Sequence, residues 1–170
     1  MNALKALKPY NLRRWKVGIP PRHFFTCARP GRTGNPASKS APVSDNPVHR
    51  WVVGLPGPKT AIVSLLGRKP DGTSEFSFYS FHGGFDCQTD HHGSLSFQEW
   101  LRHENQSIVL REHPTEDFRP IPTDVLDAVA SDIAKLLSEG RTVVVIDSGG
   151  QTRTKIICNH MHAIEDSSLS

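Results

Sequence analysis

The chain has 170 residues, of which 36% are hydrophobic and 22% charged, so it is long enough for one compact domain with its own core. No apolar run approaches the roughly 20 residues that cross a bilayer, and the three widely spaced cysteines, Cys27, Cys87 and Cys158, form neither a disulfide framework nor a metal-ligand pattern. We therefore expect a soluble, cytoplasmic protein that has no membrane span, metal site or cofactor.

The first 50 residues are strongly basic. They contain ten Lys and Arg against a single acid, Asp45, whereas residues 51–170 contain ten Lys and Arg against sixteen Asp and Glu. A short basic helix is interrupted at Pro9, and residues 27–47 are rich in Pro, Gly, Ser and Asn without periodicity. Residues 1–49 are thus predicted to be an N-terminal extension. Such a basic arm can contact nucleic acid, an anionic membrane or the protein's own acidic part, or act as a targeting segment.

Short β-rich runs and one clear helix follow this segment. Residues 51–53 and 61–66 are predicted strands, and residues 75–81 follow the turn at 70–73 as part of a hairpin. Ser96 and Glu99 form a capping box at the start of a short helix, and a further strand is expected at 107–111. Apolar side chains recur at helical spacing over residues 122–139, with Gly140 just beyond. The β-branched run at 142–146 is typical of a buried parallel strand.

A glycine loop, DSGGQTR at residues 147–153, connects this last strand to a predicted helix. A turn of this kind directs unpaired N–H groups and the positive end of the helix dipole to one point, where an oxyanion binds. Glycines let the backbone wrap closely, and an arginine can donate two parallel hydrogen bonds to phosphate oxygens. The residues expected to bind phosphate are Ser148, Gly149, Gly150, Gln151, Thr152 and Arg153.

The sequence VVVIDSGGQTRT resembles the motif of the protein-tyrosine and dual-specificity phosphatases, a hydrophobic strand followed by H-C-x-x-G-x-x-R-[ST]. In this resemblance Gly150 and Arg153 match the glycine and arginine, and Thr154 matches the hydroxyl residue that assists the leaving thiolate. Ile146 replaces the histidine, and Asp147 replaces the nucleophilic cysteine. The resemblance covers residues 50–166, with 167–170 as a tail, and implies an α/β domain with a central, mostly parallel sheet flanked by helices.

A second match is the loop EHPTEDF at residues 112–118, which follows a predicted strand and precedes the long helix. In dual-specificity phosphatases a loop in this place supplies the general acid. The resemblance implies this role for Asp117, which would protonate the leaving alkoxide or phenoxide. The alternative is that these residues only cap and orient the following helix.

Aspartate at position 147 keeps a negative charge but lacks the reactive sulfur of a thiolate. Its carboxylate can accept the loop's own N–H groups, or can repel an incoming phosphate dianion. We therefore expect a pseudophosphatase or inactivated phosphatase that binds a phosphorylated protein or a small phosphate monoester. Three alternatives stay open: an active phosphatase whose cysteine was replaced by engineering, hydrolysis through another nucleophile, and nucleic-acid or anionic-surface binding by the N-terminal arm.

Two other patterns predict structure rather than function. The sequence CARPGRTG at residues 27–34 imitates the phosphatase motif, but its arginine is one residue too close and no comparable β-rich run precedes it, so a basic loop is expected. Cys27 is nevertheless the first alternative thiol to exclude. Cys158, His160 and His162 are two residues apart on a predicted helix, so their side chains should diverge rather than share a metal ion.

Overall fold

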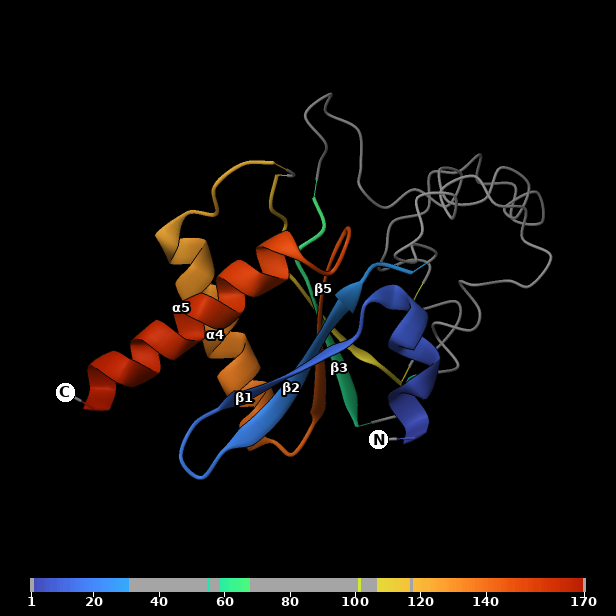
Figure 1. The fold of residues 1–170 in the computed structure, drawn as a ribbon, viewed down its shortest axis with the longest axis horizontal. Helices are drawn as coiled ribbons and strands as arrows, with labels where there is room; N and C mark the ends of the chain where they lie inside the picture. Colours follow the sequence, from blue (N-terminus) through green and yellow to red (C-terminus); the bar gives the residue numbers. More distant parts are fainter. Residues whose placement is uncertain are drawn as a thin grey trace.

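The computed structural model describes residues 2–30, 55, 59–67, 101, 107–116 and 118–169, which form a mixed β-sheet flanked by helices (Figure 1). The expected α/β architecture with a mostly parallel sheet is confirmed. The elements in chain order are the 3-10 helix η1 (Asn2–Tyr10), β1 (Arg13–Val17), β2 (Arg22–Ala28), β3 (Thr60–Ser64), β4 (Val109–Glu112), α4 (Thr123–Ser138), β5 (Thr142–Asp147) and α5 (Thr152–Leu169).

The strands predicted at 61–66, 107–111 and 142–146 and the helix predicted at 122–139 are confirmed as β3, β4, β5 and α4. α4 is followed by Gly140 as expected, because this residue has a φ of +77° and its N–H donates to the Leu137 carbonyl at 3.0 Å. The strand predicted at 51–53 and the hairpin around 70–81 lie outside the described residues, and the helix predicted from Ser96 is described only at Leu101.

The described strands follow the order β1-β2-β5-β3-β4. β1 is antiparallel to β2, whereas β2, β5, β3 and β4 are mutually parallel. β5 therefore lies between β2 and β3 although it is the last of these strands in the sequence. The carboxyl ends of the four parallel strands meet at one edge of the sheet, which is where open α/β sheets place their ligands.

The N-terminal residues differ from the prediction over residues 2–30, because β1 and β2 belong to this sheet and η1 packs in its core, while residues 31–49 lie outside the described residues. β2 pairs directly with β5, and Leu4, Leu7 and Tyr10 of η1 are buried. The basic side chains of β1, which are Arg13, Arg14 and Lys16, are exposed on an edge strand. Charges at such an edge discourage pairing with another chain. The basic residues predicted to lie in an N-terminal arm are therefore explained by their position on an edge strand. At the other end, α5 continues to Leu169, into the predicted tail.

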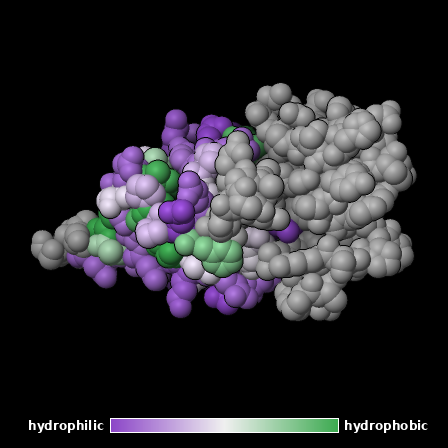
Figure 2. Space-filling view, turned by 90° about the horizontal axis from the view of Figure 1, so that it is seen from above, coloured by the Kyte–Doolittle hydropathy of each residue, from purple (hydrophilic) through white to green (hydrophobic). Residues whose placement is uncertain are grey.

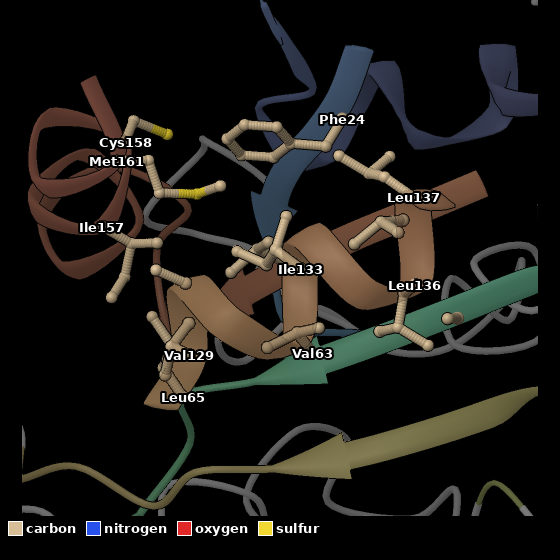
Figure 3. Packing of buried hydrophobic residues seen from close by; sticks show 14 residues of the cluster. Phe24, Val63, Leu65, Val129, Ile133, Leu136, Leu137, Ile157, Cys158 and Met161 are labelled. Carbon is tan, nitrogen blue, oxygen red and sulfur yellow. The ribbon is translucent and has the colours of Figure 1, made fainter. Parts of the chain in front are cut away.

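Both faces of β5 are buried, which explains its continuous β-branched sequence. Val143 and Val145 belong to a cluster with α4 and α5, in which Phe24 of β2, Ile133 of α4 and Ile157 of α5 pack together (Figure 3). Val144 and Ile146 belong to a second cluster that includes side chains of η1.

The coloured part of the molecular surface in Figure 2 is mainly hydrophilic, with scattered hydrophobic side chains. In the part of the chain that the structure describes, the helices are either too short or too polar to cross a membrane.

Candidate anion-binding site

A pocket of about 160 Å³ lies where β5 passes into α5, at the carboxyl edge of the sheet. Five of the six residues predicted to bind phosphate line it; Gly150 does not, because it packs against β2. The full lining consists of Phe118, Asp147, Ser148, Gly149, Gln151, Thr152 and Arg153. The structure thus brings the predicted loop residues together around one concavity.

Asp147 ends β5, and its side chain is turned back into the loop. The residue is only 2% exposed. Carboxylate Oδ1 accepts the N–H of Gly150, and Oδ2 accepts the N–H of the buried Thr154 at 3.0 Å. The carboxylate therefore accepts N–H groups from both the loop and the first turn of α5, which is the first of the two arrangements expected for aspartate at this position. Its negative charge also suits the positive end of the helix dipole.

Gly150 holds the loop against β2. Its φ is +69°, and a Cβ atom added there would lie 2.4 Å from the Ala28 nitrogen and 2.6 Å from the Cys27 carbonyl carbon. Next to this contact, the Arg29 N–H donates to the Asp147 carbonyl at 2.9 Å. A Cβ at the neighbouring Gly149 would meet nothing within 4 Å. Of the two loop glycines, only Gly150 is therefore required by close packing.

Asn11 contacts the same loop from the junction of η1 and β1. Its side-chain Nδ2 donates to the Gly150 carbonyl at 3.0 Å and lies 3.4 Å from the Gly149 carbonyl. Asn11 was not predicted as a site residue, because its partners are 138 and 139 positions away in the sequence. The one local signal was the residue type, since asparagine readily adopts the left-handed backbone seen here, with a φ of 62°.

Arg153 is 4% exposed, although it lines the pocket. One terminal nitrogen, Nη1, donates to the Thr115 hydroxyl at 2.9 Å and to the Leu65 carbonyl at 3.2 Å. The Thr115 hydroxyl in turn donates to the Leu65 carbonyl at 2.7 Å. The guanidinium therefore links the segments that follow β3 and β4. These contacts could not be read from the motif, because they join residues that are far apart in the sequence.

The predicted general acid, Asp117, lies outside the described residues. The segment around it is tied to the end of β3, because the N–H groups of His113 and Thr115 donate to the carbonyls of Ser64 and Leu65 at 2.8 and 3.2 Å. Phe118, the next residue, is 88% exposed and lines the pocket. The loop between β4 and α4 therefore reaches the pocket, and the role of Asp117 stays a prediction.

The two cysteines that the structure describes are fully buried in the two hydrophobic clusters. Cys27 is part of β2 rather than of a basic loop, so the expectation for this residue was wrong. Burial raises the pKa of the Cys158 thiol to about 12. Neither sulfur lines the pocket, and neither is suited to act there as a nucleophilic thiolate.

The side chains of Cys158, His160 and His162 diverge as expected. His160 pairs with Asp127 at 2.8 Å, and the Nε2 of His162 is hydrogen-bonded to the Lys16 carbonyl at 2.9 Å. Among the described residues, no three His, Cys, Asp or Glu side chains are placed to hold a metal ion together.

The lining residues bring together three features with distinct chemistry: the loop backbone at the start of α5, a buried guanidinium and a carboxylate at the centre of the loop. The first two favour anions, and the third competes with them. Comparison with known proteins adds no relative, because no family model, curated protein or solved structure matches this chain.

Proposed function

We propose that this protein is phosphatase-like, with Asp147 in place of the catalytic cysteine, and that it binds phosphate monoesters without efficient hydrolysis. The observation that carries the proposal is the Asp147 carboxylate, which accepts the N–H groups of Gly150 and Thr154 at the centre of the loop. In the protein-tyrosine and dual-specificity phosphatases, which the loop resembles in sequence, a thiolate takes this position. A carboxylate there has no comparable reactivity toward phosphorus.

The same carboxylate weakens the binding of phosphate. Two unit charges of the same sign that are 4 Å apart repel by about 4 kcal/mol at an effective dielectric constant of about 20. A phosphate dianion must therefore displace the carboxylate or bind at the rim of the pocket, which Ser148, Gln151 and Arg153 line. We propose a phosphorylated protein or a small phosphate monoester as the ligand, bound more weakly than by a loop without this charge.

An active phosphatase whose cysteine was replaced by engineering would have the same geometry, and it also predicts turnover by the Asp147→Cys form. The nucleic-acid alternative was based on residues 1–50. Residues 2–30 of this segment are built into the fold, and the exposed charges of Arg13, Arg14 and Lys16 are explained by the edge strand that carries them. No observation therefore favours that alternative over the phosphatase-like one.

The test compares the hydrolysis of 4-nitrophenyl phosphate by the unmodified protein, Asp147→Cys and Asp147→Asn. We expect turnover by the cysteine form alone, at least about 100-fold above the other two, because the N–H groups of Gly150 and Thr154 would stabilise a thiolate there. Asp147→Asn is the matched control, since it removes the charge without adding a nucleophile. It should bind inorganic phosphate more tightly than the unmodified protein, as measured by isothermal titration calorimetry.

In the cysteine form, Asp117→Asn should lower kcat by about 100-fold for an alkyl phosphate, whose leaving group needs a proton. An unchanged kcat would exclude Asp117 as the acid. If the cysteine form does not turn over and the asparagine form does not bind phosphate, the proposed function is wrong.

A further inference from the structure

The Asn11 side chain joins the beginning of the sheet to the loop at the end of β5. Tyr10, which precedes it, is buried, and the Asn11 N–H donates to the Lys8 carbonyl at 3.2 Å. Asn11 is therefore held by η1 on one side and by β1 on the other. From this fixed position its amide nitrogen lies 3.0 Å from the Gly150 carbonyl and 3.4 Å from the Gly149 carbonyl.

These two contacts determine which way the following N–H groups point. A trans peptide is planar, and its C=O and N–H bonds point to opposite sides. Because the Gly149 carbonyl faces Asn11, the Gly150 N–H faces away from it, and it donates to Asp147. By the same geometry, the carbonyl of Gly150 directs the N–H of Gln151 away from Asn11.

The loop needs such a constraint because two adjacent glycines allow many peptide orientations. Contact with β2 restricts Gly150, but a Cβ at Gly149 would meet nothing within 4 Å. The orientation of the first of the two peptides is therefore set by hydrogen bonds, from Asn11 to its carbonyl and from its N–H to Asp147, rather than by side-chain packing at Gly149. The asparagine amide can donate one hydrogen to each carbonyl, and asparagine also tolerates the left-handed backbone at position 11.

We infer that Asn11 is a positioning residue that orients the peptides of Gly149 and Gly150, so that the N–H groups of Gly150 and Gln151 face the oxyanion position. This role rests on the proposed function of the loop as an anion site. Asn11 does not line the pocket; it acts through the backbone of the loop.

The first test measures amide hydrogen exchange by NMR in the unmodified protein and in Asn11→Gly, which keeps the left-handed backbone but removes the amide. We expect the Gly150 amide to exchange at least about tenfold faster. The matched control is Thr26→Val, which removes a different polar contact of β1, the 2.9 Å bond from the Trp15 indole. In this control the exchange of Gly150 should change by less than about twofold.

Asn11→Asp provides a second variant in case Asn11→Gly does not fold, because it keeps the shape of asparagine and has no donor. Unchanged exchange of Gly150 in the folded variant would overturn the inference.

The second test introduces Asn11→Gly and Thr26→Val separately into the Asp147→Cys protein. We expect Asn11→Gly to lower kcat/KM for 4-nitrophenyl phosphate by about tenfold or more, because loop N–H groups stabilise the transition state. Thr26→Val should change it by less than about twofold. If Asp147→Cys is inactive and Asp147→Asn does not bind phosphate, the proposed function fails, while the exchange measurement still tests the role of Asn11.

Discussion

The loop of residues 147–153 is held on two sides by different kinds of contact. On the β2 side, Asn11 and the backbone of Ala28 and Arg29 hold the loop backbone by neutral hydrogen bonds and close packing. On the β3–β4 side, Leu65 and Thr115 hold the guanidinium of Arg153. The loop backbone and the cation of the site are therefore held by separate parts of the fold.

Gly150→Ala, which disrupts the close packing of the loop on β2, should have the largest effect. The added Cβ would overlap the backbone of Cys27 and Ala28, and the residue would be strained at its positive φ. We expect a loss of about 3–4 kcal/mol in the free energy of unfolding, measured by urea denaturation. Gly149→Ala is the matched control one residue earlier and should change stability by less than about 1 kcal/mol. Equal losses in both variants would show that close packing on β2 does not hold the loop.

Arg153→Ala removes the contacts on the β3–β4 side. It should lower the free energy of unfolding by about 2–3 kcal/mol, because hydrogen bonds from a buried charged group to the Leu65 and Thr115 oxygens are lost. It should also abolish any rise in Tm on adding phosphate. Thr115→Val removes only the hydroxyl partner and keeps Arg153. It should lower the free energy of unfolding by about 1 kcal/mol.

Combining Arg153→Ala with Asn11→Gly tests whether the two sides are independent. If the two sides act separately, the double variant should lose the sum of the two single variants' losses in free energy of unfolding, to within about 0.5 kcal/mol. A coupling clearly above this value would show that the loop transmits strain between them.

The smallest effect concerns Cys158 of α5, which lies in the hydrophobic cluster with α4 and does not line the pocket. The Cys158 pKa is raised from 9.0 to about 12 by burial, so folding favours the neutral thiol. The resulting stabilisation is complete below pH 9 and is lost as the pH rises toward 12. Between pH 8 and pH 10, urea denaturation should show that the unmodified protein loses about 1 kcal/mol more than Cys158→Ala. A constant difference between the two proteins would mean that this thiol has an ordinary pKa.

The features that could be predicted from the sequence depend on neighbouring residues. The β-branched run before Asp147, the helical spacing ended by Gly140, and the order of strand, glycine loop and helix are all local patterns. The turning of the Asp147 carboxylate toward the loop N–H groups was predictable for the same reason, because its partners lie three and seven residues ahead. The role of the loop itself stays a prediction.

The features that were missed depend on contacts between distant segments. β1 and β2 were not recognised because Arg13, Arg14 and Lys16 obscure the strand pattern, and because β2 finds its parallel partner only in β5. Asn11 and Thr115 have ordinary sequence surroundings. Their partners in the loop and on α5 become neighbours only when the sheet has formed.

The central position of β5 has a consequence for the order in which the protein can be made. β2 and β3 do not pair with each other in the sheet; each pairs with β5, which is synthesised after both. While the chain emerges from the ribosome, β2 and β3 each have one edge whose backbone hydrogen-bonding groups are not yet paired with β5. The sheet can close only when residues 142–147 are available, so the loop that follows them is among the last parts of the protein to take its final form.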